Sequence, residues 1–215
     1  MKRAFKKICL ISIVVVFIPL FSSSPLQLNQ KQRQKSITQT APVSPKIDDE
    51  IFKPSNWIAR GGYWDFSDKI FFSQGYRGPN MAYYRKRSLK NFTFEIKMMK
   101  LAEDGAFGMV FRYDESKDEG YVFGIFPHGG YFVWKINGPN NIYLELGTSA
   151  FINEEMNAWN TLRITVTGNR FDCYINGSLI KSLRDNTYSV GKVGLCNSGD
   201  PRQIAKFEII ALLEH

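Results

Sequence analysis

Short runs of alternating apolar and polar residues, separated by turn-forming residues, occupy the chain from residue 51 to residue 215. In Thr161–Thr167 and Arg170–Ile175 every second residue is apolar, which is typical of strands that bury one face. Gly168–Asn169 and Asn176–Gly177 tolerate positive φ and therefore favour tight hairpins. A third run follows at Ser178–Leu183. Residues 161–183 are thus predicted to form a three-stranded antiparallel meander with one buried face.

The rest of this region repeats the same pattern of short runs and turns. No long segment keeps a period of 3.6 residues, and the segment NEEMNAW offers one helical turn at most. Many short strands with regular turn signals are typical of an all-β sandwich or barrel. The further strands are predicted at Tyr63–Asp65, Lys69–Phe72, Ala82–Arg85, Phe92–Met99, Gly108–Tyr113, Tyr121–Phe126, Tyr131–Ile136, Ile142–Leu146, Lys192–Cys196 and Ala205–Leu212.

The first fifty residues differ from this pattern. Residues 1–24 combine a basic start, an apolar run of fourteen residues and a small polar end, as in a signal peptide. The run is shorter than the roughly twenty residues of a membrane span. Pro25 disfavours cleavage just before it, so an uncleaved N-terminal membrane anchor stays open. Residues 25–50 are predicted to be a disordered linker and residues 51–215 one β domain, extracytoplasmic and either secreted or membrane-tethered.

The net charge of +8 suggests nucleic acid or anionic lipid as a partner, but the distribution of charge argues otherwise. Seven of the 28 basic residues lie in residues 1–40, which contain no acidic residue. Residues 41–215 contain 21 basic and 20 acidic residues. The predicted domain is nearly neutral and has no basic stripe that could follow a phosphate backbone. We therefore expect no nucleic-acid partner.

Two cysteines lie in the predicted domain. Cys173 alternates in step with Phe171 and Ile175, whereas Cys196 is out of step with Val193 and Leu195. Regular strands would send the two thiols to opposite faces of the sheet. Two free thiols are predicted, with Cys173 as a small core residue.

The segment WNTLRITVTGNRFDCYINGSLIKSLRDNTYSVGKVGLCNSG resembles the C-terminal half of the concanavalin A-like lectin/glucanase superfamily, in particular its laminin-G-like and related bacterial domains. The segments FTFEIKM, DGAFGMVFRYDESKDEGYVFGI and GYFVWKI are similar to the front half, so the resemblance spans roughly residues 57–213. It implies a jelly-roll sandwich of two curved antiparallel sheets with a carbohydrate or other extracellular ligand at the concave face or loop rim. Similar domains include bacterial 3-keto-disaccharide hydrolases, so the resemblance leaves an enzyme open.

The sequence offers little catalytic chemistry. Retaining glucanases of the superfamily carry an E-x-D-x-E run on one strand, and no such run occurs here. Glu154 and Glu155 are adjacent and would diverge on a strand. His128 and His215 are the two histidines, which excludes a multi-histidine zinc site, and no G-x-S-x-G motif is present. No catalytic residue and no resident metal are therefore predicted.

Calcium is the one metal ion that stays open. Asp114, Asp118 and Glu119 lie in an acidic segment between two predicted strands and could supply oxygen ligands, although their spacing is not that of an EF-hand. The simpler interpretation is a polar hairpin loop. A second possible set comprises Asp104, Asn197 and Asp200.

Surface chemistry on the strands from Gly108 to Leu146 is the remaining candidate. If Phe132, Trp134 and Ile136 fill the core, the outer face of neighbouring strands collects aromatic rings for sugar C–H groups and charged groups for hydroxyls. A shift of one residue would move Trp134 from the core to this groove. The predicted ligand-binding residues are Arg112, Tyr131, Lys135, Tyr143 and Glu145.

These patterns favour a lectin-like module that binds a carbohydrate or another cell-surface ligand without catalysis. The alternatives are a glycoside-acting hydrolase of the 3-keto-disaccharide type and a structural interaction domain of the cell surface. An enzyme should bring two carboxylates together in a cleft, whereas a binding module should show aromatic and hydrogen-bonding groups without such a pair.

Overall fold

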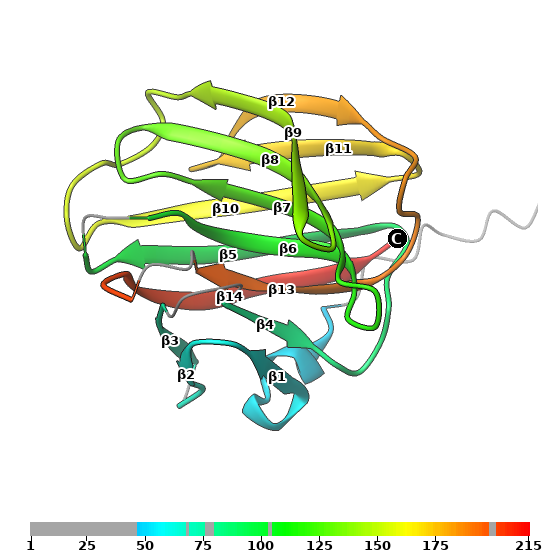
Figure 1. Cartoon of the computed structure of the whole chain (residues 1–215), viewed down its shortest axis with the longest axis horizontal. Coiled ribbons are helices and arrows are strands. Elements are labelled where there is room, and N and C mark those ends of the chain that lie inside the picture. Colours follow the sequence, from blue (N-terminus) through cyan, green and yellow to red (C-terminus); the bar gives the residue numbers. More distant parts are fainter. Residues whose placement is uncertain (1–46, 68, 76–79, 103–104, 198–200) are drawn as a thin grey trace, which may run out of the picture. The chain divides into compact units, whose positions relative to one another are not determined.

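The alternating runs form two antiparallel sheets in the computed structural model, which describes residues 47–67, 69–75, 80–102, 105–197 and 201–215. The front sheet has the strand order β1-β4-β13-β6-β7-β8-β9, and the back sheet has the order β12-β11-β10-β5-β14-β3-β2. Figure 1 shows the two sheets stacked on one another. The all-β jelly-roll sandwich predicted from the sequence is confirmed.

The elements have the following bounds. Two short 3-10 helices, η2 (Asp49–Phe52) and η3 (Pro54–Asn56), precede the strands. The front sheet comprises β1 (Trp57–Arg60), β4 (Asn80–Tyr84), β6 (Phe107–Asp114), β7 (Glu119–Ile125), β8 (Gly130–Asn137), β9 (Asn140–Thr148) and β13 (Lys192–Asn197). The back sheet comprises β2 (Tyr63–Asp65), β3 (Ile70–Gln74), β5 (Phe92–Lys100), β10 (Trp159–Thr167), β11 (Arg170–Ile175), β12 (Ser178–Arg184) and β14 (Ile204–Glu214).

The predicted meander is β10-β11-β12 of the back sheet. Asn176 and Gly177 have φ of 48° and 82°, which explains the Asn-Gly pair in this turn. Strand β10 alternates strictly between fully buried and partly exposed residues, and β11 continues the same buried face. This face forms the main core together with the inner residues of the front sheet. A period of two residues therefore identified the buried face of these strands correctly.

The front sheet is apolar on both faces. Its inner residues join the main core, and its outer residues form a second apolar cluster. The outer cluster comprises Met81, Tyr83, Ala106, Val110, Tyr113, Val122, Phe132 and Ile136, with Phe126, Trp134 and Cys196 packed against it. The front sheet therefore packs apolar side chains on both of its faces, and the outer cluster is the smaller of the two.

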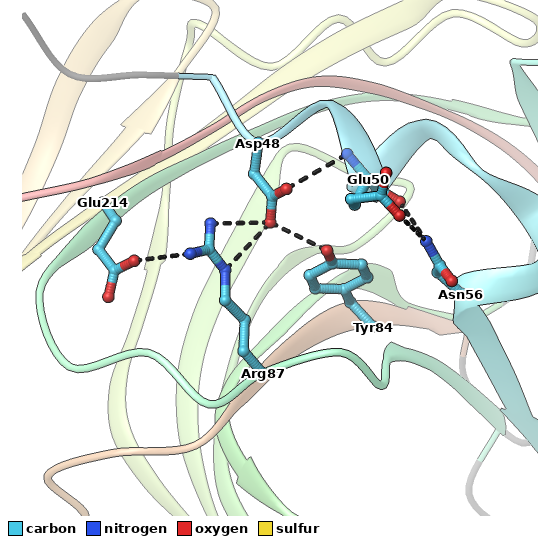
Figure 2. Close-up of polar contacts among 6 residues, drawn as sticks. All are labelled: Asp48, Glu50, Asn56, Tyr84, Arg87 and Glu214. Atoms are coloured by element: carbon cyan, nitrogen blue, oxygen red, sulfur yellow. Dashed lines mark hydrogen bonds and ion pairs between the residues drawn. The ribbon is translucent and has the colours of Figure 1, made fainter.

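Residues 47–50, which the sequence places in the linker, are folded onto the sandwich. Figure 2 shows the Asp48 carboxylate between Tyr84 and Arg87. It accepts hydrogen bonds from the Tyr84 hydroxyl at 2.9 Å and from the Arg87 guanidinium, whose other end pairs with Glu214. Burial and the neighbouring carboxylate raise the pKa of Tyr84, so its hydroxyl remains a donor. The predicted leader and residues 25–46 lie outside the described residues.

The two cysteines lie in different sheets. Cys173 is buried in the main core on β11, and Cys196 lies on the outer face of the front sheet. The front sheet therefore lies between the two thiols. The sequence had predicted that they leave opposite faces of one sheet. Among the described residues, no helix is long and apolar enough to span a membrane.

Candidate functional site

A pocket of about 350 Å³ opens on the outer face of the front sheet. Its floor comes from strands β4, β7, β8 and β13 and from the residue just before β6. Its rim comes from the β6–β7 turn and the β8–β9 hairpin. The lining residues are Asn80, Met81, Ala106, Asp118, Val122, Phe132, Trp134, Ile136, Gly138, Pro139, Asn141, Cys196 and Asn197.

Four aromatic rings form a continuous row on the outer face, and two of them, Phe132 and Trp134, line the pocket. Phe126 contacts Phe132, Phe132 contacts Trp134, and Trp134 contacts Tyr143, with ring centroids 4.8, 4.2 and 5.4 Å apart. Gly124 lies opposite Phe132 in the neighbouring strand, and a Cβ there would lie 2.5 Å from the Phe132 ring. A glycine is therefore required for Phe132 to lie against the sheet.

Trp134 is the central ring of this row and a wall of the pocket. It is half-buried, while Tyr143 beside it is 53% exposed. Within the described part of the chain the indole N–H of Trp134 has no hydrogen-bond partner. Packing against Phe132, Tyr143 and the outer apolar cluster therefore orients the indole ring, which lines the pocket.

A polar cluster closes the opposite end of the pocket. The Asp118 carboxylate accepts hydrogen bonds from Arg60 at 2.9 Å and from the Tyr113 hydroxyl at 3.0 Å. Burial, followed by the hydrogen bond to Asp118, raises the pKa of Tyr113, which keeps this hydroxyl protonated. The backbone N–H of Gly138 donates to the Asp118 carbonyl at 2.9 Å, which fixes the hairpin tip beside the β6–β7 turn. Figure 1 shows the two turns side by side.

Arg112 does not line this pocket, and the prediction that it points outward is wrong. It is 2% exposed, and its guanidinium donates to the carbonyls of Tyr188, Lys90 and Gly168 at 3.0, 2.8 and 2.5 Å. The β6 strand is irregular between Phe111 and Asp114, and Arg112 has φ of 49°. This β-bulge turns the side chain inward. Burial lowers the pKa of Arg112.

Three more of the predicted residues lie on the inner side of the front sheet. Tyr131 is buried in the main core. Glu145 pairs with Lys181 of the back sheet at 2.7 Å, and Lys135 donates to the Thr187 hydroxyl at 3.0 Å. The Glu145–Lys181 pair joins the edge strands β9 and β12 of the two sheets, and Lys135 reaches the loop that follows β12. The expected single outer surface is therefore wrong for Arg112, Tyr131, Lys135 and Glu145.

Tyr143 is the predicted residue that lies on the outer face beside the pocket. None of the residues that line the pocket was among the predicted ligand-binding residues. Those of β8 were missed because Phe132, Trp134 and Ile136 were expected in the core. The prediction that successive β8 side chains alternate between the two faces is correct, but the core face and the outer face are exchanged. The glycines of β6 and β7 were the available signal, since Gly108 and Gly124 pair with one another in the middle of apolar strands.

Two of the side chains considered as possible calcium ligands have other partners among the described residues. Asp114 accepts hydrogen bonds from the backbone and hydroxyl of Ser116, and Asp118 is held by Arg60 and Tyr113. Among the described residues, no group of three or more acidic, histidine or cysteine side chains is placed to hold a metal ion. In the second set, Asp104 and Asp200 lie outside the described residues.

Comparison with known proteins identifies the family. Residues 45–210 match the model of the 3-keto-alpha-glucoside-1,2-lyase-like domain. The chain belongs to this family. No curated protein sequence is significantly similar to the chain.

Several solved structures share the fold. The carbohydrate-binding module CBM66 from Bacillus subtilis is 19% identical with a TM-score of 0.65, over 74% of this chain and 96% of that one. A protein from Parabacteroides distasonis that is named as a candidate glycosyl hydrolase is 12% identical with a TM-score of 0.53, over 74% of this chain and 88% of that one. The lumenal domain of VIP36, solved with Ca²⁺ and Man3GlcNAc, is 12% identical with a TM-score of 0.59, over 79% and 90%. At these identities the likeness shows the concanavalin A-like fold.

Proposed function

We propose that the chain binds carbohydrate in the pocket on the outer face of the front sheet. The observation that carries the proposal is the row of aromatic rings around Trp134, which presents a flat surface for the C–H face of a sugar ring. Asp118 and Asn141 at the rim supply groups for hydroxyls. The family and the similar structures, several of which are described as binding or cleaving carbohydrate, support this proposal.

Binding without catalysis fits the described pocket better than hydrolysis does. Among the described residues that line the pocket, Asp118 is the one carboxylate, and Arg60 and Tyr113 hold it. A glycosidase of the usual kind needs two carboxyl groups on either side of the scissile bond. We also propose that the domain acts outside the cytoplasm, secreted or tethered by its N-terminal segment.

The test is a glycan array probed with the full-length chain, with and without calcium. Trp134→Ala should weaken binding to every bound glycan at least tenfold, because a stacking ring at the centre of a site is worth more than about 1.4 kcal/mol. The matched control is Trp159→Ala, which removes a half-buried tryptophan from the opposite, outer face of the back sheet. Binding that survives Trp134→Ala unchanged would place the ligand elsewhere, and no bound glycan would favour the structural interaction domain.

The second candidate function is an enzyme that acts on glycosides, and the description of the family favours it. Disaccharides and their 3-keto derivatives, incubated with the chain, would then give products that disappear in Asp118→Asn. We expect binding without product formation. Turnover that depends on Asp118 would reject the non-catalytic module and retain the pocket as the site.

A further inference from the structure

The floor of the pocket has a different chemistry from its rim. Met81, Ala106, Val122 and Ile136 are each less than a tenth exposed, and all belong to the outer apolar cluster. None of these four side chains can hydrogen-bond a sugar hydroxyl. A saccharide ring placed on these four side chains would lose hydration of its hydroxyl groups without compensation.

The remaining floor residues of β4 and β13 are Asn80, Asn197 and Cys196, and they are also uncharged. The Asn197 amide donates to the Ser73 hydroxyl of the back sheet at 3.0 Å. Cys196 lines the pocket, and burial raises the pKa of its thiol to about 12. At neutral pH the thiol is protonated and behaves as a small apolar group. Among the described lining residues, the charged group is Asp118, which lies at the rim and is paired with Arg60.

The rim, in contrast, suits a sugar. Tyr143 is exposed, Trp134 is half-buried beside it, and the exposed Asn141 lies on the same strand as Tyr143. The aromatic row leads from this rim down to Phe132, which is 1% exposed. One ligand can therefore contact the polar rim and the apolar floor at the same time.

We infer that the ligand is a glycoside with an uncharged apolar aglycone, which fills the floor while its sugar stacks on Trp134 and Tyr143. This inference rests on the proposed carbohydrate-binding function and adds the class of ligand. The pocket volume of about 350 Å³ lies at the lower end of the range for small-molecule sites and has room for a ring-sized apolar group beyond the sugar.

The experiment compares methyl and phenyl glycosides of glucose, galactose, mannose and xylose, with phenol as the aglycone alone. Affinities for the full-length chain are measured by isothermal titration calorimetry. For the sugar that binds, the phenyl glycoside should bind about 10- to 100-fold more tightly than the methyl glycoside, the gain expected from burying one aromatic ring. Binding should show a more negative heat-capacity change for the phenyl compound.

Two variants separate the two parts of the pocket. Ala106→Leu fills the floor, so it should abolish the advantage of the phenyl glycoside and leave the methyl glycoside unchanged. Tyr143→Ala removes the exposed ring that contacts Trp134, so it should weaken both compounds by the same factor. Val122→Ile, a smaller addition to the same floor, replaces Ala106→Leu if the melting temperature shows that the latter is unfolded.

Each outcome decides a different claim. Equal affinities for methyl and phenyl glycosides overturn the inference and leave the proposed carbohydrate binding intact. An advantage of the phenyl compound that survives both floor variants also overturns it, because the aglycone then lies elsewhere. Binding of phenol without any glycoside overturns the proposed function, and binding of none of the compounds overturns both.

Discussion

Arg112→Ala should destabilise the sandwich strongly without touching the pocket. The Arg112 guanidinium donates to three backbone carbonyls, those of Lys90, Gly168 and Tyr188, which lie in three separate connections between strands. The Cζ atom of Arg112 also lies 5.4 Å from the centre of the Phe171 ring in the core. One buried side chain therefore fastens three loops to β6.

The magnitude follows from these contacts. Loss of the guanidinium removes a hydrogen bond from each of three carbonyls. Each carbonyl that stays unpaired lowers the free energy of unfolding by about 1 to 3 kcal/mol. Water that enters the space and relief from burying a charge offset part of this sum. We expect a loss of about 3 to 5 kcal/mol, which lowers Tm by roughly 6 to 20 °C for a domain of this size.

Thermal and urea unfolding of the full-length chain measure this loss. Arg163→Ala is the matched control, because Arg163 also lies on a strand but stacks on Tyr174 at the outer face of the back sheet. The Cζ atom of Arg163 lies 4.0 Å from the centre of the Tyr174 ring. It should cost about 1 kcal/mol. Arg112→Lys keeps the charge but not the planar fork and should fall between the two. One kcal/mol corresponds to about 3 °C in Tm for a domain of this size. A Tm of Arg112→Ala that lies within about 3 °C of the wild-type Tm would therefore refute the reasoning.

Two further predictions concern carboxylates away from the pocket. Asp48→Asn should lower the free energy of unfolding in urea by about 2 kcal/mol, because the nearly buried Asp48 carboxylate accepts charged hydrogen bonds. Glu214→Gln, at the exposed end of the same network, should lower it by less than about 1 kcal/mol. Equal losses in the two variants would contradict this. Although burial opposes ionisation of Asp185, hydrogen bonds from Thr187 and Tyr121 hold its pKa below the usual value. A lowered pKa adds stability above about pH 4 that is lost as the pH falls further, so melting temperatures between pH 2.5 and 6 should decline less steeply in Asp185→Asn than in the wild type.

The fold was predictable because most back-sheet strands separate the two environments of a sandwich cleanly. In β10 and β11 one face is apolar and the other polar, so a period of two residues identifies the core face directly. Turn residues with positive φ, such as Gly168 and Gly177, mark the ends of these strands. Local pattern and tertiary environment agree there, and the meander follows from the sequence alone.

The orientation of β8 was not predictable in this way. Its apolar residues lie on both faces, because one face fills the core and the other builds the pocket. Tyr131 and Val133 enter the core, while Phe132 and Trp134 line the site. Lys135 gives the wrong signal, because it lies on the inner side and reaches the open edge of the sandwich, where it meets Thr187. A strand that serves both a core and a site thus loses the polar face from which its orientation could be read.

Irregular pairing explains the rest of the misplaced residues. Tyr143 and Glu145 are two residues apart and would share a face in a regular strand. Pairing of β8 with β9 shifts between Val133 and Trp134, so that Glu145 lies opposite Val133 on the inner side and Tyr143 lies opposite Trp134 on the outer side. The same kind of shift turns Arg112 inward on β6. A bulge leaves no mark in the alternation of residue types, yet it reverses every assignment beyond it. These two bulges lie in the front sheet, on strands that contribute to the pocket or adjoin it. Periodicity therefore fails at the positions that decide which side chains reach the outer face.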